Sequence, residues 1–156
     1  MKKFIFILIV LISSNLYADF FIESTSTGIV QNEGYKLPNG NQFALLKGTY
    51  QWTNNLGYYG TATCKGLLEK ERDLSSVNFL CAVNQKGDKQ YFIFKRKAND
   101  LHSGSGKSVI VDATGDNKIL IGTECNFAAT YLNDVAFAKM KCPVPEKVFN
   151  ELKNKL

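Results

Sequence analysis

Four cysteines are the residues of this chain whose type and spacing most directly indicate chemistry. Cys64 and Cys81 are 17 residues apart, and Cys125 and Cys142 are again 17 apart. The chain has no C-x-x-C motif, and a gap of this length fits neither a zinc knuckle nor a dithiol redox site. The spacing therefore favours structural disulfides, for which four cysteines allow three pairings.

The N-terminus indicates where these thiols reside. Lys2 and Lys3 precede an apolar run at residues 4–12, and a polar stretch then ends on Ala18. This is the layout of a secretory signal peptide cut after Ala18, and the run is shorter than the roughly 20 residues that span a bilayer as a helix. We expect a signal peptide at 1–18, a single domain at 19–156, and a periplasmic or extracellular protein without stable membrane insertion, in an environment where disulfides persist.

Strand register selects one cysteine pairing. A two-residue turn at residues 133–134 places Leu132 opposite Val135, and counting outward brings Cys125 opposite Cys142. Their Cα atoms would then lie roughly 4.5 Å apart, within reach of a disulfide. Alternation also puts both cysteines on the apolar face of this hairpin.

The other two cysteines follow the same logic. Cys64 and Cys81 lie on the apolar faces of two successive strands, and the charged segment 69–76 between them is expected to be a loop. We therefore predict Cys64–Cys81 and Cys125–Cys142, each joining adjacent strands from the core side.

Catalytic groups are sparse. His102 is the only histidine, and it lies in a Gly/Ser-rich segment, 99–106, that we interpret as a solvated loop rather than part of a triad. Residues 106–108 resemble the end of a phosphate-binding loop, but Leu101 stands where a glycine is required and a strand is expected to follow. We assign no catalytic residue, no metal ligand and no cofactor.

Period-two alternation in short runs dominates the rest of the sequence. We expect strands at 20–30, 42–53, 58–68, 77–84, 89–97, 107–112 and 118–122, in addition to the 125–142 hairpin, with residues 31–41 as loop. Residues 146–156 place Val148, Phe149, Leu152 and Leu156 on one helical face. The pattern is typical of a barrel or a sandwich, and glycines at 48, 57, 60 and 66 favour coiled strands that close a small barrel. We therefore predict an all-β fold, an antiparallel barrel of eight or nine strands with a short C-terminal helix.

An eight-stranded barrel is either filled by side chains or holds one small ligand. Six inward-facing residues are candidates for lining such a ligand site, and packing of the core is the alternative role for them. They are Tyr50, Trp52, Phe79, Phe127, Tyr131 and Met140.

Two glycine-rich stretches carry a resemblance to a known family. They are residues 48–66, GTYQWTNNLGYYGTATCKG, and 104–122, GSGKSVIVDATGDNKILIG. The second resembles the Gly-Thr-Gly-x-(aromatic)-x-Gly-(apolar)-x-Gly pattern of allene-oxide-cyclase-like and dirigent-like barrels, with Ala113, Asn117 and Ile119 departing from it. The resemblance implies an eight-stranded antiparallel barrel of the calycin or allene-oxide-cyclase-like kind, often trimeric in the plant enzymes, and transfers no catalytic residue.

The charge balance argues against nucleic acid. Removing Lys2 and Lys3 with the leader lowers the formal net charge from +5 to +3, and the arginines are not clustered. We expect a non-enzymatic exported barrel that binds a small apolar ligand or a protein partner, with a homo-oligomer left open. The alternatives are a cyclase or isomerase acting on a lipid-like substrate, and a structural or interaction protein of the cell envelope. A cavity of several hundred cubic ångströms would favour a ligand or a substrate, and a filled interior the structural role.

Overall fold

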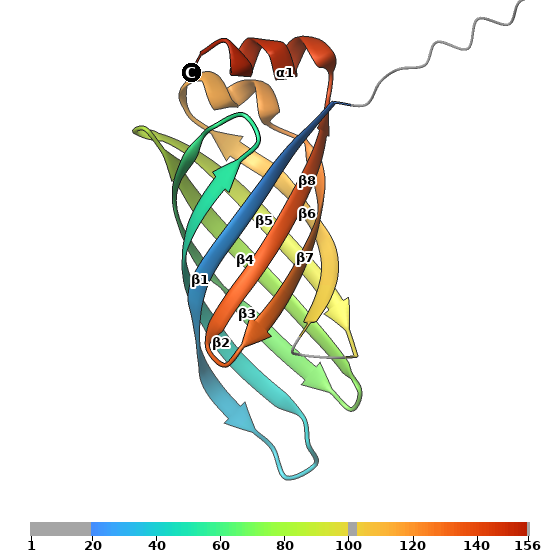
Figure 1. The fold of residues 1–156 in the computed structure, drawn as a ribbon. Coiled ribbons are helices and arrows are strands. Elements are labelled where there is room, and N and C mark those ends of the chain that lie inside the picture. The colour runs from blue at the N-terminus through green and yellow to red at the C-terminus, as the bar shows by residue number, and fades with distance from the viewer. Residues whose placement is uncertain (1–19, 100–102, 156) are drawn as a thin grey trace, which may run out of the picture.

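The computed structural model describes residues 20–99 and 103–155. Eight antiparallel strands close into one barrel, in which each strand pairs with the next and β8 pairs with β1 (Figure 1). The strands are β1 (Phe20–Lys36), β2 (Gln42–Asn54), β3 (Tyr59–Glu71), β4 (Leu74–Gln85), β5 (Asp88–Ala98), β6 (Ser103–Ala113), β7 (Glu124–Leu132) and β8 (Val135–Val144). The 3₁₀ helix η1 (Gly115–Leu120) lies between β6 and β7, and the α-helix α1 (Glu146–Lys153) follows β8. The predicted all-β barrel with a short C-terminal helix is confirmed, with eight strands.

Alternation along the strands builds the core. On β4, Val77, Phe79 and Cys81 are buried, whereas Asn78 and Leu80 between them are exposed. Because successive side chains of a strand point to opposite faces, one set fills the barrel and the other meets solvent.

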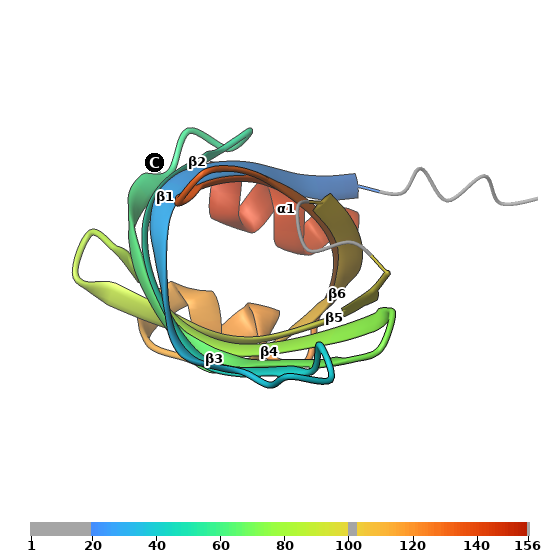
Figure 2. The same ribbon diagram turned by 90° about the horizontal axis from the view of Figure 1, so that it is seen from below.

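Both helices lie at the same end of the barrel, which we call the capped end (Figures 1 and 2). Leu120 of η1 and Leu152 of α1 are buried there, and the ring of Phe149 on α1 lies 5.4 Å from the ring of Phe20. The β1–β2 hairpin projects at the other end, which we call the open end (Figure 1).

Two disulfides join neighbouring strands inside the barrel. Cys64 of β3 bonds to Cys81 of β4, with their Cα atoms 4.0 Å apart, and Cys125 of β7 bonds to Cys142 of β8, with a Cα separation of 4.2 Å. The pairing predicted from spacing and register is confirmed, and Leu132 pairs with Val135 as the two-residue turn requires.

Of the two segments that were expected to be loops, 69–76 is strand on both sides of a tight turn, whereas 31–41 is strand as far as Lys36 and turn beyond it. β3 and β4 continue through 69–76 and meet at a tight turn around Arg72, whose φ is 52°, and β1 continues to Lys36. The charges that suggested a loop at 69–76, such as Glu69 and Glu71, sit instead on exposed strand positions. Charge therefore marked a solvated face rather than a break in the sheet.

The region after β5 also differs from expectation. β6 begins at Ser103, so Gly104 and Gly106 are strand residues rather than part of a loop. A Cβ on Gly106 would lie 2.8 Å from the ring of Phe127, so the glycine makes room for an aromatic neighbour. His102 lies outside the described residues.

The strand expected at 118–122 is wrong, because η1 occupies most of it. Asn117 and Leu120 are three residues apart, which is one turn of a 3₁₀ helix, and both are buried. A strand would have sent these two side chains to opposite faces, whereas the helix directs both to the interior.

No helix within residues 20–99 or 103–155 is long and apolar enough to cross a membrane. The leader proposed for residues 1–18 lies outside the described part of the chain.

Candidate ligand-binding cavity

The barrel encloses a cavity of about 150 Å³. All six residues that the sequence selects contribute to its wall: Tyr50, Trp52, Phe79, Phe127, Tyr131 and Met140. The alternation of the strands is what turns them inward. Whether they contact a ligand stays a prediction.

Aromatic rings pack against one another along the wall. The ring centroids of Phe94 and Phe127 are 5.2 Å apart in an edge-to-face arrangement, and those of Phe92 and Phe94 are 5.6 Å apart. The sulfur of Met140 accepts a hydrogen bond from the hydroxyl of Ser108 at 3.4 Å. These contacts fix the shape of the apolar wall, since aromatic pairs prefer such tilted geometries.

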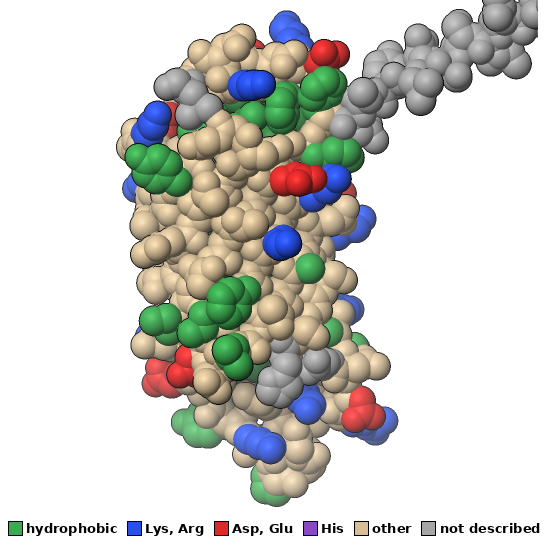
Figure 3. Space-filling model, in the orientation of Figure 1, with side chains coloured by type: hydrophobic (Ala, Val, Ile, Leu, Met, Phe, Trp, Pro, Cys, Tyr) green, Lys and Arg blue, Asp and Glu red, His purple; other side chains and the backbone are tan. Residues whose placement is uncertain are grey.

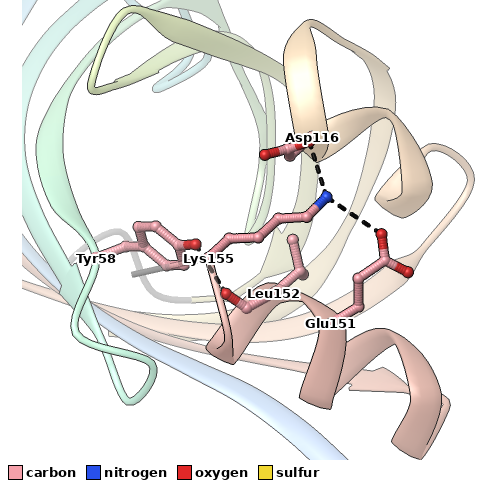
Figure 4. Close-up of polar contacts among 5 residues, drawn as sticks. All are labelled: Tyr58, Asp116, Glu151, Leu152 and Lys155. Carbon is pink, nitrogen blue, oxygen red and sulfur yellow. Dashed lines mark hydrogen bonds and ion pairs between the residues drawn. The ribbon is translucent and has the colours of Figure 1, made fainter.

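The capped end is held by contacts between elements distant in sequence (Figure 4). The hydroxyl of Tyr58, in the β2–β3 turn, donates to the backbone carbonyl of Leu152 at 2.8 Å. Beyond α1, the Lys155 ammonium reaches between Asp116 of η1, at 2.8 Å, and Glu151, at 3.2 Å. The two helices and the β2–β3 turn therefore form one cap over the cavity.

Polar groups also line the capped end. Gln85, Gln90 and Asn117 are buried and contribute to the cavity wall, although their neighbours are mostly apolar. The sequence analysis did not single them out. Gln85 and Gln90 lie near strand ends, where polar residues are ordinary, and the 3₁₀ helix that turns Asn117 inward was not foreseen.

The wall nearer the open end carries a buried cation. Arg96, 5% exposed, is the one charged residue among the described residues that line the cavity, and its guanidinium lies 5.6 Å from the ring centroid of Tyr131. Burial raises the pKa of the Tyr131 hydroxyl, and the charge of Arg96 opposes that shift. Burial also raises the pKa of Tyr50. Both hydroxyls are therefore neutral at physiological pH.

The described residues offer no obvious reactive centre. No group of three His, Cys, Asp or Glu side chains within 20–99 and 103–155 is placed to hold a metal ion. The titratable side chains that line the cavity are Tyr50, Tyr58, Tyr131 and Arg96, and all three tyrosine pKa values are shifted upward, away from neutral pH. A general acid or base works best with a pKa near the operating pH, which the three tyrosines do not have.

The outer surface mixes charge types. On the face drawn in Figure 3, Lys and Arg side chains are interspersed with Asp and Glu. Apolar side chains gather on the lower half of this face (Figure 3). Ile29 of β1 and Phe137 of β8 are among the exposed large apolar residues. A protein partner could bind to this exposed apolar surface, but exposure alone identifies no partner.

No protein-family model matches the chain, and no curated protein matches it either. Membership of the allene-oxide-cyclase-like or dirigent-like barrels therefore stays a prediction, because closed antiparallel barrels occur in several unrelated families.

Proposed function

We propose that this protein is a non-enzymatic, exported binding protein that holds one small, mainly apolar molecule inside its barrel. The observation that carries the proposal is the capped cavity with its wall of aromatic side chains. The two disulfides support export, since such bonds persist in oxidising compartments.

The size of the cavity limits the ligand. At about 150 Å³ it is smaller than the several hundred cubic ångströms that a drug-sized ligand would need. Cavities of about this volume in protein cores accept molecules the size of benzene. The ligand is therefore a single ring or a short chain, rather than a long lipid.

A line of small side chains supports a binding role over a filled structural core. Ser26 of β1 pairs with Ala138 of β8, which pairs with Ala129 of β7, and all three line the cavity. At these three paired positions, the adjacent strands β1, β8 and β7 thus present no large inward side chain. A barrel that served only as scaffold gains stability when such space is filled, because voids forfeit packing contacts.

Toluene is a suitable first probe, and Trp52 is a suitable reporter. Trp52 is the only tryptophan of the chain and lines the cavity, so its emission reports on the interior. We expect saturable toluene binding, and an Ala138→Leu substitution should weaken it at least about tenfold by filling the space. Ala128→Leu, on the exposed side of β7, is the matched control and should leave binding unchanged.

Two results would contradict the proposal. One is the absence of saturable toluene binding in the folded wild type. The other is native mass spectrometry that finds only unliganded protein after purification from its own compartment. The N-terminus of that material also tests export, which predicts that the mature chain begins at Asp19.

A further inference from the structure

Two hydrogen-bond donors on the cavity wall have no acceptor among the described residues. They are Nδ2 of Asn117 and Nε1 of Trp52, both buried atoms. Asn117 as a whole is only 2% exposed. Leaving a buried donor unpaired costs about 1–3 kcal/mol, so such groups normally have a partner.

Both donors belong to the same part of the cavity. Asn117 is in η1, which forms part of the cap, and Trp52 lies two residues before the end of β2, the end that leads into the capped-end turn at Tyr58. Gly60, which pairs with Trp52 across the β2–β3 ladder, leaves room beside the indole: a Cβ there would come within 3.2 Å of Nε1. The indole nitrogen of Trp52 therefore lies close to Gly60, which has no side chain to cover it.

The charge of this region is as informative as its donors. The polar lining residues at the capped end are uncharged, and they include the buried residues Gln85, Gln90 and Asn117. Arg96 lies only two residues from the other end of β5. An anion placed at the capped end would have no cation from the described lining residues beside it, and an isolated buried charge is strongly disfavoured.

Resting on the proposed function, we infer that the ligand is an uncharged molecule with an oxygen acceptor, such as a ketone, ester or ether, on a small apolar body. The oxygen points to the capped end and accepts a hydrogen bond from Asn117, Trp52 or both. The apolar body lies among the aromatic rings.

Matched six-membered rings test this inference. Cyclohexane supplies only the apolar body, cyclohexanone adds a neutral acceptor, and cyclohexanecarboxylate adds an anion. In a ¹H–¹⁵N spectrum of the wild type, the single indole N–H resonance of Trp52 and the side-chain amide of Asn117 report directly on the donors. We expect cyclohexanone to move at least one of these resonances downfield, and cyclohexane to move neither in that direction.

Two substitutions measure the contribution of each donor. Asn117→Leu keeps the side-chain volume but removes the amide, and Trp52→Phe removes Nε1. We expect one or both to weaken cyclohexanone binding by about 2- to 12-fold, the range for one net hydrogen bond, while cyclohexane binding is preserved in Asn117→Leu. Asn150→Leu, on the exposed face of α1, is the matched control and should change neither affinity.

The outcomes separate this inference from the proposed function. If neither cyclohexane nor cyclohexanone binds the wild type, the binding proposal itself fails. If cyclohexane binds but cyclohexanone shifts neither donor resonance, or if the carboxylate binds more tightly than the ketone, the inference is overturned and the binding proposal stands. The spectra use the wild type, so they decide the question even if a variant fails to fold.

Discussion

Removing one disulfide at a time tests the energetic role of the two cross-links. The variants are Cys64→Ala with Cys81→Ala, and Cys125→Ala with Cys142→Ala. Each bond closes a loop of 17 residues. The chain-entropy relation, about 2.1 cal/mol/K plus 1.5R ln n, gives roughly 3 kcal/mol at 25 °C for a loop of this length.

Because the two disulfides close loops of equal length, removing either one should lower the free energy of unfolding by the same amount. The two loops do not overlap in sequence, so their contributions should add to about 6 kcal/mol, within the 5–15 kcal/mol that separates folded from unfolded states in a typical domain. Each single-pair variant should therefore fold with a lower free energy of unfolding, and the variant without cysteines should be marginal or unfolded.

Equilibrium urea unfolding of the oxidised proteins provides the measurement. Reducing the variant that keeps only Cys64–Cys81 isolates the effect of that cross-link from the effect of removing the sulfur atoms. A difference of more than about 2 kcal/mol between the two pairs would refute the assignment of their stabilisation to loop closure. Peptide mapping that found Cys64 linked to Cys125 or Cys142 would refute the register argument itself.

Three further substitutions probe the cap and the wall. Leu152→Ala should cost about 2–5 kcal/mol in urea unfolding, because the side chain is 3% exposed beneath α1, and a cost below about 1 kcal/mol would show that the cap is not packed as described. Lys155→Met should lower Tm at pH 7, and its difference from wild type should vanish in alkaline solution. Hydrogen bonds to Asp116, the larger effect, and to Glu151 raise the pKa of Lys155 above its ordinary 10.5. The stability that these bonds contribute is therefore present below pH 10.5 and is lost as the pH rises through the raised pKa. A difference in Tm that persists at high pH would contradict this. Gly60→Ala should cost about 1–3 kcal/mol in the same urea assay, since the new methyl meets the backbone carbonyl of Asn84, which cannot rotate away, and a neutral result would contradict the close approach.

Much of the fold could be predicted because alternation and equal cysteine spacing are local patterns. The turn at residues 133–134 fixes the register of β7 and β8, and the same counting centres the β3–β4 turn between Arg72 and Asp73. That second turn was missed because charge was taken as a sign of a loop. Alternation along the strands also identified six lining residues, since it depends only on which face of a strand a residue occupies.

The cap could not be predicted in this way. Residues 115–120 combine Gly, Asp and Asn, a composition typical of a turn, and a six-residue 3₁₀ helix leaves little periodicity to detect. Its position over the barrel depends on contacts far along the chain, such as Asp116 with Lys155. Asn117 consequently carries no sequence signal as a wall residue, although its burial supports the proposed ligand chemistry most directly.

Strand register explains where the cavity lies, which alternation alone cannot. Each of the five aromatic residues selected from the sequence pairs with a small residue on a neighbouring strand: Tyr50 with Gly28, Trp52 with Gly60, Phe79 with Gly66, Phe127 with Gly106 and Tyr131 with Ala136. Pairing a large side chain with a small one lets the aromatic rings fill the interior without overpacking it. Along the line Ser26–Ala138–Ala129, small residues of three neighbouring strands meet one another, and Trp52 of β2, which pairs with Ser26, borders this line. Alternation tells which side chains face inward, but only register tells which ones meet, and the space for a ligand arises where small residues of three neighbouring strands meet.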